Sequence, residues 1–162
     1  MFGLAPAFAL DAVSLERSYR EIQSQIHPDR YAHAGDAERR ASMQWTTRVN
    51  EAYRTLKSPV QRAKYLLEMN GVDVGIETNT QMPTDFLLRQ LELREALAEA
   101  KQPAALDELM AQVRREQRLL EQGIAQLIDG RKDYAAAAGE VRKLMFLDKL
   151  AAEIDLAYEG VD

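Results

Sequence analysis

Apolar residues recur every three or four positions along most of the chain, the spacing that places side chains on one face of an α-helix. The first such run predicts a helix capped by Asp11 and ended at Ile26, because Pro28 disfavours helical geometry in the residue before it. After a loop over 27–35, a second helix is predicted to begin at an Asp36 cap. Its expected inward positions are Ala41, Trp45, Val49, Ala52 and Leu56.

A third, short helix is expected from Val60 to Met69. Ser58-Pro59 has the residue types of a helix start, and Asn70-Gly71 those of a helix end. These first three helices should form one helical hairpin with a short helix behind it.

Residues 72–82 are the least periodic stretch and are interpreted as a linker. Three longer helices are expected beyond it, over 83–101, from Pro103 to a break at Gly130, and from Tyr134 onward. Amphipathic helices joined by short turns predict an antiparallel three-helix bundle. The expected inward positions of the last helix are Tyr134, Ala137, Val141, Leu144, Leu147, Ala151, Ile154 and Tyr158.

Composition supports an all-α fold. Leu and Ala together number 44, against 14 for Val and Ile, and no stretch keeps the two-residue alternation of a strand. We therefore predict a first domain over 1–71, a linker over 72–82 and a three-helix domain over 83–162. The first 71 residues carry 10 basic and 8 acidic side chains, and the rest carry 11 and 18, so the two parts suit different partners.

Several kinds of chemistry are excluded by the residue counts. Without cysteine there is no disulfide, thiolate nucleophile or cysteine-ligated cluster, and two histidines cannot form a three-histidine metal site. The net charge of −5 argues against nucleic-acid binding. The apolar start of the chain lacks the basic residues of a secretory signal and is too short to cross a bilayer. We expect a cytoplasmic protein without cofactor or membrane contact.

The tripeptide His27-Pro28-Asp29 falls in the loop of the predicted hairpin. Proline restricts its own backbone and that of the preceding residue, so an imidazole and a carboxylate are displayed at a stiff turn. Helical spacing also places Arg17, Arg20 and Ser24 in a row that leads to His27, which would suit an acidic partner. From these residues alone, a solvated turn without function is the more common outcome.

The sequence around the tripeptide favours a functional turn over a merely solvated one. HPDR (27–30), VNEAYRTL (49–56) and SPVQRAKYLL (58–67) resemble the J-domain of co-chaperones, and TDFLLRQLELREAL (84–97) and VRKLMFLDKL (141–150) look like the C-terminal domain of the HscB family of iron–sulfur cluster assembly. The lack of a cysteine-bearing N-terminal extension fits the bacterial type. The resemblance implies that the protein stimulates ATP hydrolysis by an HscA/DnaK-type chaperone. The activating residues would be His27, Pro28 and Asp29, and the docking charges Arg17, Arg20 and Arg30.

The helix expected over 83–101 carries more leucine than one core face needs. At about 100° per residue, its core face holds Phe86, Leu93 and Leu97. The other leucines point elsewhere, bordered by glutamates, as in a protein-binding surface. In the last helix, Phe146 and Leu150 also lie off the predicted core stripe. The family resemblance implies that a scaffold protein of the IscU type binds Leu87, Leu88, Leu91, Glu92, Glu95, Glu99 and Phe146.

Other interpretations remain open at this point. The leucines could pack within a wider core or against the first domain, which is about as common as a binding surface. The bundle could also serve a different client of a J-domain co-chaperone. A hydrolase using His27 and Asp29 fails because no nucleophile or metal set accompanies them, and the absence of a Gly-x-x-x-x-Gly-Lys loop argues against an ATP site. We therefore expect a protein that is not an enzyme.

Overall fold

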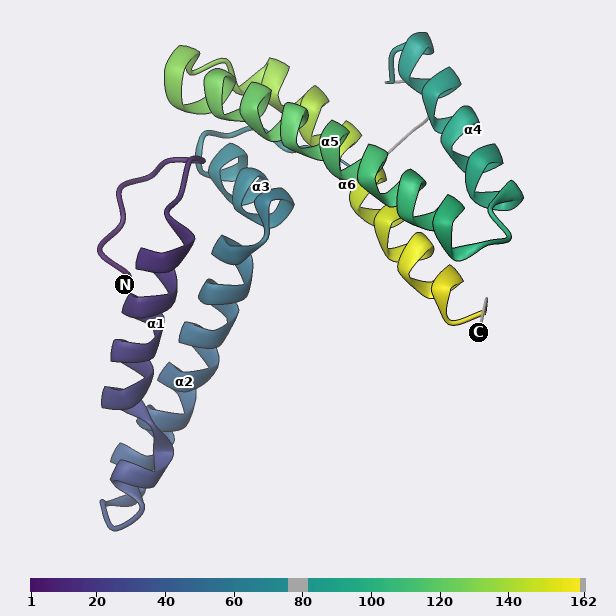
Figure 1. Cartoon of the computed structure of the whole chain (residues 1–162). Coiled ribbons are helices and arrows are strands. Elements are labelled where there is room, and N and C mark those ends of the chain that lie inside the picture. The colour runs from purple at the N-terminus through teal and green to yellow at the C-terminus, as the bar shows by residue number, and fades with distance from the viewer. Residues whose placement is uncertain (76–81, 161–162) are drawn as a thin grey trace. The chain divides into compact units, whose positions relative to one another are not determined.

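The computed structural model describes residues 1–75 and 82–160, and this part of the chain holds six α-helices and no strand (Figure 1). The predicted all-α fold class is confirmed. The chain divides into two compact units, Met1–Leu66 and Leu67–Asp162. The predicted domain limits at 71 and 83 stay predictions, and most of the predicted linker lies outside the described residues.

The first unit is built on an antiparallel pair, α1 (Ala12–Ile26) and α2 (Asp36–Lys57), joined through the short 3₁₀ helix η1 (Pro28–Tyr31) (Figure 1). Asp11 caps α1 as predicted, since its carboxylate accepts a hydrogen bond from the Val13 amide. Apolar side chains from both helices and from the segment before α1 form the core of the hairpin. They are Leu10, Leu15, Tyr19, Ile22, Ile26, Val49, Ala52, Tyr53 and Leu56, with Phe2 packed among them.

Two expectations for α2 are wrong. Gly35, not Asp36, is the N-cap, and Asp36 instead pairs with Arg39 inside the first turn. Trp45, expected in the core, is 51% exposed, whereas Ser42 is buried. Ala41 is exposed as well. At about 100° per residue, Ser42 and Trp45 lie on opposite sides of the Val49 direction, at about 20° and 40° from it, so helical spacing alone does not separate them. Ser42 is the one turned inward, where its hydroxyl donates to the Ile26 carbonyl at the end of α1.

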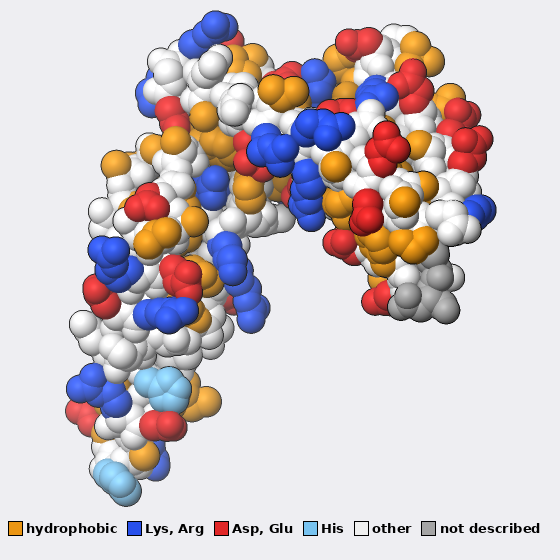
Figure 2. Space-filling view, in the orientation of Figure 1, with side chains coloured by type: hydrophobic (Ala, Val, Ile, Leu, Met, Phe, Trp, Pro, Cys, Tyr) orange, Lys and Arg blue, Asp and Glu red, His pale blue; other side chains and the backbone are white. Residues whose placement is uncertain are grey.

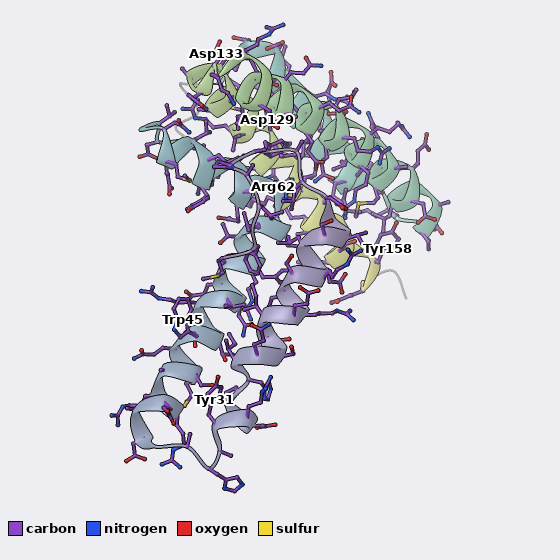
Figure 3. The ribbon with its side chains drawn as sticks, turned by 90° about the vertical axis from the view of Figure 1, so that its left-hand side faces the viewer. Tyr31, Trp45, Arg62, Asp129, Asp133 and Tyr158 are labelled. Carbon is purple, nitrogen blue, oxygen red and sulfur yellow. The ribbon has the colours of Figure 1, made fainter. Side chains whose placement is uncertain are left out.

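The third helix, α3 (Pro59–Met69), begins and ends where the sequence predicts. The Gln61 amide donates to Ser58 Oγ at its start, and Gly71 takes a left-handed φ of 74° just past its end. Arg62 is a buried member of this helix, labelled in Figure 3. Its guanidinium donates to the Phe8 carbonyl at 2.8 Å and lies over the Phe8 ring, which fixes the N-terminal segment to the unit.

The second unit contains α4 (Thr84–Glu99), α5 (Pro103–Ala125) and α6 (Tyr134–Tyr158), with a π-helical turn, η3 (Gln126–Arg131), after α5. α5 and α6 pack along their length, and α4 contacts both less extensively (Figure 1). The predicted break at Gly130 is wrong. Gly130 lies inside the π turn, and the chain reverses at Lys132, whose φ of 56° is left-handed.

Candidate protein-binding sites

The turn at residues 27–29 is displayed at the end of the hairpin. The side chain of His27 is 50% exposed and that of Asp29 is 91% exposed. His27 has φ −57° and ψ 133°, the extended conformation that a following proline favours. The Asp29 amide donates to His27 Nδ1 at 3.2 Å, which ties the imidazole to the backbone of the turn. Both polar side chains are therefore presented at a fixed corner and can meet a partner.

Side chains satisfy the last three carbonyls of α1 and so hold this turn in place. Arg30 donates to the Ser24 carbonyl at 3.0 Å and the Tyr31 hydroxyl to the Gln25 carbonyl at 3.3 Å. From α2, Ser42 Oγ donates to the Ile26 carbonyl at 2.6 Å. The carbonyls at a helix end lack partners within the helix, so these bonds complete α1 and join it to η1 and α2.

Sequence reasoning missed Tyr31 and Ser42 as residues of this site. A signal was available, because a proline that forces a helix to end also leaves carbonyls that need donors. The predicted docking residue Arg30 takes part in this framework as well as being exposed.

The predicted row of basic residues on α1 faces solvent. Arg17, Arg20 and Ser24 are all exposed, and Arg20 pairs with Glu16 at 2.5 Å. An exposed pair of this kind is worth little, so the arginine remains available to an acidic partner. Figure 2 shows Lys and Arg side chains along the hairpin and histidine side chains at its turn end.

A second candidate surface lies on α4, and we call it the leucine face. Leu88 and Leu91 are 59% and 56% exposed, whereas Leu87 is half-buried. The helix points its core positions inward as its spacing predicts, with Leu93 buried. The interpretation that all the leucines fill a core is therefore wrong for Leu88 and Leu91. The leucine face consists of Leu87, Leu88, Leu91, Glu92, Glu95 and Glu99, and its three glutamates are all exposed.

Ion pairs attach the leucine face to the rest of the bundle. Arg89 of α4 bonds Glu116 of α5 at 2.5 Å and Glu92 at 2.8 Å. Hydrogen bonds to these two carboxylates raise the pKa of Arg89. One carboxylate of the leucine face is thus already engaged within the protein.

The prediction that Phe146 and Leu150 face solvent is wrong. Phe146 is 6% exposed and Leu150 is fully buried. The Phe146 ring stands edge-on to Phe86 of α4, with centroids 5.8 Å apart. Arg94 lies over the same ring at 5.4 Å and pairs with Glu153 at 2.8 Å. The prediction assumed a single inward stripe, but α6 packs against α5 on one side and α4 on another, so a wider arc is covered.

Neither a membrane segment nor a metal cluster is found in the part of the chain that the structure describes. None of its helices is long and apolar enough to cross a bilayer. Over the same residues, no group of three or more His, Asp or Glu side chains is placed to hold a metal ion.

A helical hairpin with an exposed His-Pro-Asp turn, followed by a helical bundle, defines the class of J-domain co-chaperones. The model of the HSCB C-terminal oligomerisation domain matches residues 82–155. The co-chaperone protein HscB homologs of Ralstonia nicotianae and Burkholderia vietnamiensis are 50% and 47% identical to the whole chain, over 94% of their own lengths. The chain belongs to the HscB co-chaperone family.

Solved structures agree with this assignment. The chaperone HscB from Vibrio cholerae has a TM-score of 0.84 and 33% identity, covering 99% of this chain and 96% of that one. The human co-chaperone protein HscB has a TM-score of 0.92 and 27% identity, covering 97% and 79%. The family resemblance predicted from the sequence is confirmed.

Proposed function

We propose that the protein is a cytoplasmic adaptor of iron–sulfur cluster biogenesis that brings two partners together. It stimulates ATP hydrolysis by an HscA/DnaK-type chaperone and delivers an IscU-type scaffold protein to it. The adaptor performs no catalysis and needs no cofactor of its own. The observation that carries the proposal is the exposed, hydrogen-bonded turn at 27–29 within a chain of the HscB family.

The chaperone is proposed to contact the turn and the basic row on α1. His27, Pro28 and Asp29 act as the activating residues, supported by the exposure of the His27 and Asp29 side chains and by the hydrogen bonds that fix the end of α1. Arg17 and Arg20 supply exposed positive charge beside them, and charge of this kind speeds and orients the encounter with an acidic surface. The third predicted docking residue, Arg30, follows the turn and donates to the carbonyl of Ser24, the last residue of the row.

The scaffold is proposed to bind the leucine face. Leu88 and Leu91 supply the exposed apolar area and the three glutamates its charged border. Burying the exposed half of each leucine contributes about 1–1.5 kcal/mol. Association costs at least about 4 kcal/mol, more than the two leucines contribute together, so other contacts of the face must supply the remainder. The surplus is then small and the complex should be transient, as delivery to a second protein requires. Phe146 lies beneath Arg94 at the edge of this face and joins the contact only if Arg94 moves.

The test is a steady-state ATPase assay of the HscA-type chaperone alone, with this protein, with the scaffold, and with both. We expect the two additions together to stimulate hydrolysis more than the sum of their separate effects, because one adaptor raises their effective concentration for each other. A pull-down that recovers other clients but no scaffold would favour the alternative of a different client.

A histidine pair provides the matched control. His27→Gln should abolish stimulation while leaving scaffold binding intact, because the leucine face lies on another element. His33→Gln, at the second and also exposed histidine, should leave both activities unchanged. Equal loss in the two variants, or no stimulation by the unaltered protein, contradicts the proposal.

A further inference from the structure

A small cavity lies directly beside the turn, between the end of α1, η1 and the first half of α2. Its volume is about 160 Å³. Tyr31 and Trp45, two of its walls, are labelled in Figure 3 near the end of the hairpin that carries the turn. The lining residues are Ile26, Tyr31, Glu38, Ala41, Ser42 and Trp45.

The chemistry of the walls suits an aliphatic side chain. The hydroxyls of Ser42 and Tyr31 already donate to α1 carbonyls, so both are occupied inside the protein. The remaining surface comes mainly from Ile26, Ala41 and the Trp45 indole. The site opens to solvent, and its volume is of the order of one leucine or methionine side chain.

Trp45 is the wall most suited to bind a partner. It is the chain's only tryptophan and is 51% exposed, although its ring offers the largest apolar area of any side chain. Tryptophan is enriched among the few residues that carry most of the binding energy of protein interfaces. Glu38 stands at the same cavity and is exposed, so its carboxylate can accept a hydrogen bond from an entering segment.

The position of the cavity indicates which partner fills it. Ile26 immediately precedes His27, and Tyr31 follows Asp29 by two residues, so the walls of the cavity and the turn are continuous in the chain. The hydrogen bonds that hold the turn also hold Tyr31 and Ser42, so the cavity is formed before binding. A preformed site loses little free energy to ordering. A protein bound at the turn therefore lies next to residues that line the cavity.

We propose that this cavity is a second docking site for the ATPase chaperone, which inserts one aliphatic side chain against Trp45. The inference rests on the proposed function, since it assigns the cavity to the same partner as the turn. The cavity adds affinity, whereas His27, Pro28 and Asp29 deliver the activating contact. Docking and activation can therefore be separated by mutation.

The test measures ATPase stimulation by the full-length protein over a range of its concentrations. Trp45→Ala should raise the concentration for half-maximal stimulation roughly tenfold, which corresponds to about 1.4 kcal/mol, while the maximal rate stays unchanged. Met43→Ala is the matched control. Met43 is an equally exposed apolar residue of α2, two positions away and on another side of the helix, and its replacement should change neither value.

A second variant shows whether an effect of Trp45→Ala comes from the cavity or from misfolding. Ala41→Met fills the cavity with the protein's own side chain and keeps Trp45, so it should raise the half-maximal concentration as well. Scaffold binding, which uses the second unit, should be unchanged in both variants.

Half-maximal concentrations equal to that of the unaltered protein in Trp45→Ala and Ala41→Met would overturn the cavity proposal alone. A lowered maximal rate with an unchanged half-maximal concentration would also overturn it, because Trp45 would then act through the turn. Absence of stimulation by the unaltered protein would instead overturn the proposed function itself, and the cavity assignment with it.

Discussion

The turn at 27–29 and the leucine face differ in how the protein holds them. The turn is polar and short, and three hydrogen bonds to successive carbonyls of α1 fix the chain on both sides of it. The leucine face is apolar and belongs to α4, which contacts its neighbours less extensively than α5 and α6 contact each other. Arg89 and Arg94 supply ion pairs that attach it.

This difference matches the two tasks that we propose. An activating contact needs its groups in one geometry, which hydrogen bonds specify by direction. A transient apolar contact needs exposed area, which a helix held by ion pairs and a few apolar contacts can present while still adjusting to its partner. The predictions below test whether the two regions are as different as this comparison implies.

The largest effect is expected at the leucine face. Replacing both Leu88 and Leu91 by Ala removes exposed apolar area worth about 2–3 kcal/mol in the complex, so scaffold affinity should fall roughly 30- to 100-fold. Isothermal titration calorimetry measures it. The free energy of unfolding should hardly change, since both side chains face solvent. Leu119→Ala, at a 67% exposed leucine of α5, is the control and should bind normally.

The next effect is expected at the turn. Ser42→Ala removes the 2.6 Å donor to the part-buried Ile26 carbonyl and leaves it only the weaker bond from Thr46 Oγ1 at 3.5 Å, which should lower the free energy of unfolding by about 1 kcal/mol. Urea denaturation measures the loss, and hydrogen exchange should show it at amides 27–31. Ser24→Ala, at an exposed serine that bonds within α1, is the control. Equal stability of the two variants would show that the turn does not depend on the α2 hydroxyl.

A smaller effect is expected at Arg94, and it tests how adjustable α4 is. Its guanidinium lies over Phe146, so a scaffold that reaches this ring must first displace it. A contact of this kind is worth about 0.5–1 kcal/mol, and Arg94→Ala should therefore tighten scaffold binding two- to fivefold. In a Phe146→Leu background the same change should have no effect on affinity. Weaker binding by Arg94→Ala would mean that the guanidinium itself contacts the scaffold.

Much of this comparison was predictable from the sequence, and the parts that were not share a cause. Periodicity and helix-end residues located α1, α3 and α6, and helical spacing oriented Leu88 and Leu91 correctly. It placed Phe146 wrongly because the number of neighbours of a helix is a tertiary property. It also placed Trp45 inside, because apolar spacing does not show that a carbonyl at the end of α1 needs the Ser42 hydroxyl on that side of α2.

The smallest effect is expected at a hydrogen bond between α5 and α6, the two helices that α4 packs against. Tyr158, at the end of α6, donates to the Asp107 carboxylate of α5 at 2.7 Å, and this hydrogen bond raises the pKa of Tyr158 to about 12. Because the folded pKa lies above the unfolded value of 10.0, the stabilisation is complete below pH 10 and is lost as the pH rises toward 12. Ultraviolet absorbance should show the ionisation of Tyr158 at about pH 12.

Two isosteric variants separate the causes of this shift. Asp107→Asn keeps an oxygen acceptor but removes the charge, so the pKa of Tyr158 should fall back toward its ordinary value. Asp155→Asn removes only a minor electrostatic contribution and should change that pKa less. If Asp107→Asn and Asp155→Asn change the pKa of Tyr158 equally, the hydrogen bond between Tyr158 and Asp107 is not formed in solution. The sparsely attached α4 would then lie on a framework that is itself adjustable, and the contrast with the fixed turn would extend to the whole bundle.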